Sequence, residues 1–188
     1  IPRAPSAGVI AGDVITMHNG IRIKALSYYG GRIMNMLVEN KGVHEPQEEL
    51  VFAEVIPHLP KDPTSLEMGA YWGFYSLWLK TRRPAARCHL VEPDPANLQS
   101  GKINFAMNGF AADFECAFVS DHDAQPAHGT PTISVDGYCQ RKQIAHLHLL
   151  HSDIQGFELK MLAGARRMFS ARKIDYAFIS THTVELHR

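Results

Sequence analysis

Acidic residues and glycines follow one apolar stretch of this chain at a spacing suited to holding a ligand. Leu66 and Glu67 lie at the end of that stretch, Gly69 and Gly73 follow, and a second apolar run begins at Phe74. Glycine lets a backbone approach a ligand closely, and the N–H groups at the start of a helix favour a bound carboxylate or phosphate. The pattern predicts a strand, a tight turn and a helix that together bind one end of a ligand.

A second acid, Glu92, ends the next predicted strand, 88–91. An acid at this position can accept hydrogen bonds from both hydroxyls of a ribose. A nicotinamide dinucleotide requires Gly-x-Gly-x-x-Gly around its pyrophosphate, and the third glycine is missing here. Glu67 suits the ammonium of an amino-acid moiety better, so the pattern favours S-adenosylmethionine as cofactor. We expect the cofactor to be bound by Glu67, Gly69, Ala70, Tyr71, Gly73, Ser76, Glu92, Pro93, Ser120 and Asp153.

Asp153 and His182 are the residues that we expect to activate a methyl acceptor. Both follow predicted strands, and Asp153 can either take a proton itself or orient the imidazole of His182. A divalent cation bridging Asp153, Glu158 and His182 is an alternative, although we predict no metal site. Each residue also has a structural alternative: His182 as a hydrogen-bonding loop residue, Asp153 as the cap of the next helix, and Glu158 as a first-turn acid.

Histidine is abundant in the chain, with 11 residues. In a strand, His146 and His148 would share one face and His151 would lie on the other, so the three do not converge as metal ligands should. His44 and Glu45 precede a predicted helix, where they can close over the cofactor, meet the acceptor or cap the helix.

Five predicted strands, mostly separated by helices, give the chain its organisation. Such an order indicates an α/β fold with a mostly parallel, Rossmann-like sheet, helices on both faces, and the ligand at the carboxyl ends of the strands. We interpret 1–12 as a loose lead-in and leave 133–143 unassigned. The predicted elements are a hairpin over 14–17 and 21–24 around Asn19-Gly20, helices over 46–56, 96–107 and 157–169, and strands ending at Glu67 and Glu92 and over 113–119, 147–150 and 174–180.

Composition limits the possible partners. The 188 residues include 19 Lys plus Arg and 19 Asp plus Glu, so no charge excess indicates a nucleic acid or an anionic membrane as partner. The three cysteines lie far apart in apolar contexts, and no apolar run reaches membrane-spanning length. We expect a cytoplasmic protein that acts on a small-molecule hydroxyl acceptor; the sequence does not indicate the oligomeric state.

Taken in order, five segments resemble the FkbM-type methyltransferases, a branch of the class I S-adenosylmethionine-dependent methyltransferases. The segments are 42–49, 66–76, 91–94, 153–158 and 179–182. The resemblance implies O-methylation of a hydroxyl on a sugar, polyketide or related natural product, with Glu67, Gly69 and Gly73 at the methionine end of the cofactor and Glu92 at its ribose. Tyr71 and Gln155 depart from the asparagine and glutamate that many relatives have there.

We expect one compact domain, in which an N-terminal hairpin and lid or helix extension, 1–60, precedes an S-adenosylmethionine-binding methyltransferase core, 61–188. The class I fold has two further strands after the fifth, and the sequence ends at Arg188, so we expect the C-terminal strands to be missing.

Two other functions remain open at this stage. One is a methyltransferase-like domain that binds the cofactor or a partner without catalysis. The other is an NAD(P)-dependent short-chain oxidoreductase, because Tyr138 and Lys142 form Tyr-x-x-x-Lys near Ser134. The missing three-glycine fingerprint argues against the second.

Overall fold

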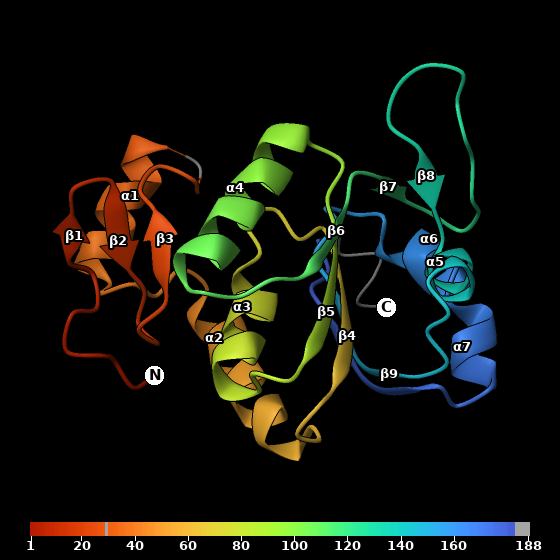
Figure 1. Cartoon of the computed structure of the whole chain (residues 1–188), viewed down its shortest axis with the longest axis horizontal. Helices are drawn as coiled ribbons and strands as arrows, with labels where there is room; N and C mark the ends of the chain where they lie inside the picture. Colours follow the sequence, from red (N-terminus) through yellow and green to blue (C-terminus); the bar gives the residue numbers. More distant parts are fainter. Residues whose placement is uncertain (29, 183–188) are drawn as a thin grey trace.

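The computed structural model describes residues 1–28 and 30–182, and its centre is a parallel sheet of five strands (Figure 1). The strands are β4 (Thr64–Met68), β5 (Arg87–Val91), β6 (Asp113–Glu115), β9 (Leu147–Ser152) and β10 (Ile174–Ile179), in the spatial order β10-β9-β4-β5-β6. Every neighbouring pair is parallel. All of β4 is buried, as expected for a central strand covered on both faces. The strand order reverses between β4 and β9, where the ligand site of such a sheet lies.

Helices cover both faces of this sheet, which confirms the predicted α/β class. In Figure 1, α2 (Pro46–Val55), α3 (Phe74–Arg82) and α4 (Pro95–Met107) lie on one side, and α5 (Val135–Arg141), α6 (Glu158–Ala163) and α7 (Arg166–Ser170) on the other. A short 3₁₀ helix, η1 (Ile56–His58), follows α2. None of the helices in the described ranges combines the length and the apolar character needed to cross a lipid bilayer.

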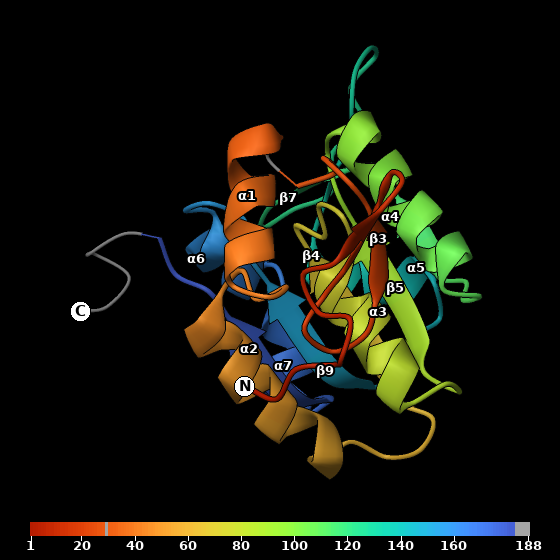
Figure 2. The ribbon, with the colours of Figure 1, turned by 90° about the vertical axis from the view of Figure 1, so that its left-hand side faces the viewer.

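The predicted N-terminal hairpin is present and belongs to a three-stranded antiparallel sheet. Its strands are β1 (Ile10–Ala11), β2 (Val14–Thr16) and β3 (Arg22–Lys24), and α1 (Gly31–Glu39) follows. The assignment of 1–12 to a loose lead-in was therefore wrong for β1, whose two exposed residues are too few to show a period in the sequence. The sheet is joined to α4 because Asn104 Oδ1 accepts a hydrogen bond from the Lys24 N–H at 2.9 Å, and Figure 2 shows β3 beside α4.

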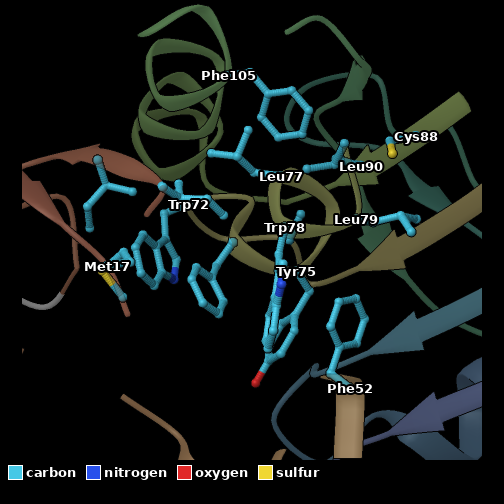
Figure 3. Close-up of a cluster of buried hydrophobic side chains, with 14 of the residues drawn as sticks. Met17, Phe52, Trp72, Tyr75, Leu77, Trp78, Leu79, Cys88, Leu90 and Phe105 are labelled. Atoms are coloured by element: carbon cyan, nitrogen blue, oxygen red, sulfur yellow. The ribbon is translucent and has the colours of Figure 1, made fainter. Parts of the chain in front are cut away.

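A hydrophobic cluster connects the N-terminal segment to α3. Trp78 packs against Phe52 of α2 with ring centroids 5.3 Å apart, and Met17, next to β2, is fully buried in the same cluster. Figure 3 shows these side chains together with Tyr75 and Trp72. Since the cluster joins residues on both sides of position 60, the division of the chain at that position stays a prediction.

The predicted third strand, 113–119, is two strands in the structure. β6 ends at Glu115, and β7 (Phe118–Val119) pairs instead with β8 (Thr132–Ile133) in a separate parallel pair. The Phe118 N–H donates to the Pro131 carbonyl at 2.8 Å, so a segment distant in sequence draws the chain away from the central sheet. The unassigned region contains α5, whose start is capped by Ser134 Oγ, which accepts from the Gly137 N–H at 3.0 Å.

The predicted helix over 157–169 is also divided, into α6 and α7. Asp136 causes the break, because its carboxylate accepts hydrogen bonds from the N–H groups of Arg167 at 2.8 Å and Met168 at 3.0 Å. The Gly164 carbonyl accepts from the Asp136 N–H at 2.8 Å. One residue on α5 thus ends one helix and caps the next.

Candidate functional site

A pocket of about 730 Å³ lies at the carboxyl ends of the central strands. Its walls come from the segments that follow β4, β5 and β9, from β7, and from the N-terminal segment. Most of the residues predicted to bind a cofactor line it: Glu67, Gly69, Ala70, Tyr71, Glu92, Pro93, Ser120 and Asp153. Gly73, Ser76 and His182 are not among the lining residues.

Glu67 connects the pocket to the start of α3. Its side chain is buried, and Oε2 accepts a hydrogen bond from the Ser76 N–H at 2.9 Å. α3 has no side-chain cap of its own at Gly73, so this carboxylate satisfies one of the unpaired N–H groups of the first turn. Oε1 lies 3.5 Å from His151 Nδ1. Ser76 therefore fixes the orientation of Glu67 from behind the pocket.

The two glycines are required by contacts within the chain. Gly69 has φ +78°, and a Cβ there would collide with the Asp153 backbone carbonyl. Gly73 has φ +76°, and a Cβ there would lie 3.1 Å from Leu90 and Phe105 side-chain atoms. At Gly69 the absent side chain lets the turn after β4 pack directly against the segment after β9. The two strand ends are thus held at the distance that forms the pocket.

Glu92 is held firmly where a ribose could meet it. Oε2 accepts from the Tyr71 N–H at 2.9 Å, and Oε1 accepts from the Asp94 N–H at 3.0 Å and Asn97 Nδ2 at 3.4 Å. These donors fix the carboxylate; Oε2 keeps one acceptor site for a further donor, and at Oε1 the 3.4 Å contact with Asn97 is the long one. Asn97, which also lines the pocket, was missed by the sequence analysis because it lies inside a helix.

Asp153 and His182 come together as expected, but only Asp153 lines the pocket. His182 Nε2 lies 3.1 Å from Asp153 Oδ1, and His182 Nδ1 lies 2.8 Å from Glu158 Oε1. Burial, with the nearby carboxylates of Glu45 and Glu48 adding to it, raises the pKa of Asp153. A raised pKa makes a carboxylate a better proton acceptor. His182 contacts Asp153 Oδ1 from outside the pocket lining and can therefore orient this carboxylate.

The geometry distinguishes between the functional and the purely structural interpretations of Asp153 and Glu158. Asp153 does not cap α6, because the residue before that helix is Phe157. Glu158 is more than a first-turn acid, since it also contacts His182; burial acts to raise its pKa, but hydrogen bonds from the Gly156 N–H and His182 outweigh burial and lower it. The imidazole stands between the two carboxylates and presents a different nitrogen to each, which does not suit one shared cation.

A buried ionic cluster forms the wall beyond Asp153. His44 Nε2 lies 3.2 Å from Glu45 Oε2, and the other ring nitrogen pairs with the fully buried Glu49. Burial alone would lower the pKa of His44, but the two carboxylates outweigh it and raise that pKa to about 9. The Tyr75 hydroxyl donates to Glu45 Oε2 at 2.9 Å. His44, Glu45 and Tyr75 all line the pocket.

The residues of the oxidoreductase alternative lie elsewhere. Tyr138 is fully buried, with its hydroxyl 3.1 Å from His89 Nδ1. Lys142 Nζ pairs with Asp113 at 2.9 Å, and Ser134 caps α5. None of the three lines the pocket. The Tyr-x-x-x-Lys pattern is a structural coincidence.

A second group of potential metal ligands lies at the opposite ends of the strands. His146, His148 and Asp175 each place one ligand atom within 4.8 Å of the others. His148 Nδ1, however, accepts a hydrogen bond from the Thr64 N–H at 2.9 Å, so the neutral ring carries its proton on Nε2. A metal-binding histidine needs the reverse, with its second nitrogen donating. His151 lies on the other face of β9 and lines the pocket, as the alternation predicted.

Together these features define a class of protein. A parallel sheet in this order, with a pocket at its carboxyl edge and an acid at the end of each of its first two strands, is a Rossmann-like class I methyltransferase fold. Residues 67–188 match the methyltransferase FkbM domain, and the chain belongs to that family. This membership confirms the resemblance seen in the sequence. It also supports S-adenosylmethionine as the cofactor and excludes the oxidoreductase alternative.

Solved structures of similar fold include other methyltransferases. The precorrin-6y C5,15-methyltransferase of Geobacter metallireducens GS-15 is 13% identical with a TM-score of 0.51, over 73% of this chain and 65% of that one. The O-methyltransferase TomG of Streptomyces achromogenes, in complex with SAM, is 15% identical with a TM-score of 0.44, over 66% and 51%. The chain thus spans less than two thirds of either structure. The comparison with curated proteins gave no match.

Proposed function

We propose that this chain binds S-adenosylmethionine in the pocket and transfers its methyl group to a hydroxyl of a sugar, polyketide or related natural product. The observation that carries the proposal is the alignment of Glu67, Glu92 and Asp153 at one edge of the sheet, all lining the same pocket. A volume of about 730 Å³ is within the range of small-molecule sites. The family supplies the methyl-transfer chemistry, and the hydroxyl acceptor is inferred from the resemblance.

The residues fit this cofactor at both of its ends. Glu92 would accept hydrogen bonds from the ribose hydroxyls, because it is fixed by backbone donors and faces the pocket. Glu67 would bind the ammonium through Oε1, since its other oxygen is held by the Ser76 N–H. Gly69, Ala70 and Tyr71 form the turn between these two acids. Ser120 and Pro93 line the wall on the β5 side.

Asp153 is the residue that we assign as general base. When bound, S-adenosylmethionine supplies a methyl group on a positively charged sulfur, which leaves as a neutral thioether. The acceptor oxygen forms the new C–O bond, and its proton passes to Asp153. A positioned base contributes about 10²- to 10⁴-fold to such a reaction. His182, in contact with Asp153, would hold the carboxylate in place and stabilise its negative charge between reactions.

Calorimetric titration tests the cofactor assignment before any acceptor is known. S-adenosylhomocysteine and NADH would each be titrated into the wild type, Glu92→Gln and the matched control Glu54→Gln, which alters an exposed acid on α2. We expect S-adenosylhomocysteine alone to bind, about 10-fold or more weakly to Glu92→Gln, because a hydrogen bond to a charged group contributes about 1.5–3 kcal/mol. Equal binding by all three proteins would refute the role of Glu92.

Catalysis is tested separately, with hydroxyl-bearing sugars and polyketides as acceptors and radiolabelled methyl transfer as readout. If Asp153→Asn loses methyl transfer but still binds S-adenosylhomocysteine, the result would support Asp153 as the general base. Retained cofactor binding with no transfer to any acceptor would favour a non-catalytic domain. A cytoplasmic location and the absence of metal and nucleic-acid partners stay predictions; the three free cysteines are compatible with that location.

A further inference from the structure

His151 is a buried residue with one ring nitrogen, Nε2, that has no hydrogen-bond partner among the described residues. It lies on β9 beside Glu67 of β4, is 3% exposed and lines the pocket. Its ring packs against Tyr75, with centroids 4.5 Å apart, and against Phe178 at 5.2 Å. Nε2 has no hydrogen-bond partner in the part of the chain that the structure describes, and Nδ1 has only a long contact of 3.5 Å with Glu67 Oε1. Buried polar groups are almost always paired, so Nε2 points to a ligand that is bound during function.

Two carboxylates border the same part of the pocket. Asp153 follows His151 closely at the end of β9, and Glu45 reaches it from the N-terminal segment. Glu45 has 31% of its side chain exposed, and the Tyr75 hydroxyl and His44 fix its Oε2. No lysine or arginine is found among the described residues that line the pocket. His44, the nearby cation, already pairs with Glu49 through its second nitrogen.

This group lies across the pocket from the predicted ribose site. Glu92 follows β5 and Asp153 follows β9, and these strands flank β4 on opposite sides. Adjacent strands are about 4.8 Å apart, so the two ends are separated by roughly 10 Å. Glu67 lies between them on β4. A cofactor with its ribose at Glu92 and its amino acid near Glu67 therefore leaves the His151 side of the pocket for another molecule.

We propose that His151, Glu45 and Asp153 form the acceptor subsite, and that it takes a group that donates hydrogen bonds and carries no negative charge. This inference rests on the proposed function. A hydroxyl or an ammonium group can donate to the imidazole and to the carboxylates. A phosphate or carboxylate has no cation to meet here, and two carboxylates repel it. The acceptors selected are thus neutral polyols and amino-bearing compounds.

Sinefungin and S-adenosylhomocysteine provide a test that needs no acceptor. Sinefungin carries an amine at the position of the transferred methyl group, and S-adenosylhomocysteine carries nothing there. Both would be titrated calorimetrically into the wild type, Glu45→Gln, His151→Phe and the control Glu54→Gln. We expect the wild type and the control to bind sinefungin about 10-fold or more tightly, and both site variants to lose most of that ratio.

Each outcome decides a separate point. The subsite is overturned if the wild type binds sinefungin no more tightly than S-adenosylhomocysteine. It is also overturned if both site variants keep the wild-type ratio of the two affinities. Competition of inorganic phosphate with sinefungin at fixed ionic strength overturns the exclusion of anions. If S-adenosylhomocysteine itself fails to bind, the proposed function falls and the subsite with it. If His151→Phe does not fold, as judged by circular dichroism, Glu45→Gln and the wild-type ratio carry the test.

Discussion

The buried ion pair between His44 and Glu49 should make the stability of the fold fall at mildly alkaline pH. The pKa of His44 is raised from 6.5 to about 9 in the folded state. A raised pKa contributes stability that is complete below pH 6.5 and is lost as the pH rises through 9. The difference between the folded and unfolded pKa values corresponds to about 3 kcal/mol of unfolding free energy, of which about half is lost between about pH 7.5 and about pH 9.

Urea unfolding at these two pH values measures the effect. In this window ordinary histidines have already lost their protons, and His44 contributes the larger part of the change. Burial raises the pKa of the Cys88 and Cys139 thiols to about 11 and about 12, so they add a smaller fall of stability in the same direction. His44→Asn removes this titrating group and should reduce the loss of stability by more than half, whereas His122→Asn, at a histidine with 68% of its side chain exposed, should keep it. If His44→Asn does not fold, an NMR titration of the His44 ring in the wild type gives its pKa directly. Wild-type stability that is constant or rises across the window would refute the reasoning.

Three further predictions concern the framework of the site. Gly69→Ala should lower the unfolding free energy by about 1–2 kcal/mol for the positive φ alone, and by more because its Cβ meets the Asp153 carbonyl; urea unfolding measures this, and an unchanged midpoint would contradict it. Asp136→Ala removes the cap of α7 and should cost about 0.5–2 kcal/mol, which corresponds to about 2–4 °C in Tm per kcal/mol; a thermal melt measures this, with Asp62→Ala, at an exposed loop residue, as control. Tyr138→Phe should leave cofactor affinity and methyl transfer unchanged, because this hydroxyl lies outside the pocket; a loss of transfer without a loss of stability would reopen its role.

The strands and the acids at their ends were predictable because the pattern that carries them is local. An apolar run that ends in an acid marks both the strand and the end that reaches the pocket, as at Glu67 and Glu92, and Asp153 follows a later apolar run after two polar residues. Such residues reach the pocket wherever the strands are parallel, since all carboxyl ends share one edge. Their convergence therefore follows from the element order alone.

The errors came from interactions between distant segments. The break between α6 and α7 is caused by Asp136, about thirty residues away, and the end of β6 by pairing with the segment at Pro131. His151 was examined only as a metal ligand, because its unpaired Nε2 is visible only in three dimensions. His44 and Glu45 were noted, but their ionic cluster depends on Glu49 inside α2, which reads as an ordinary helical acid in the sequence.

The pocket joins two parts of the chain that are attached to the fold in different ways. The family match begins at residue 67, whereas Tyr28, His44 and Glu45 supply a wall of the pocket from before that point. The strand ends that line the pocket belong to the central sheet, so a change of backbone there disturbs the fold. The N-terminal wall is attached through side chains: Phe52 and Met17 lie in one hydrophobic cluster with α3, and the Tyr75 hydroxyl donates to Glu45. Evolution or design could therefore exchange that wall for another with a similar apolar face, changing the shape of the pocket while the strand ends stay the same.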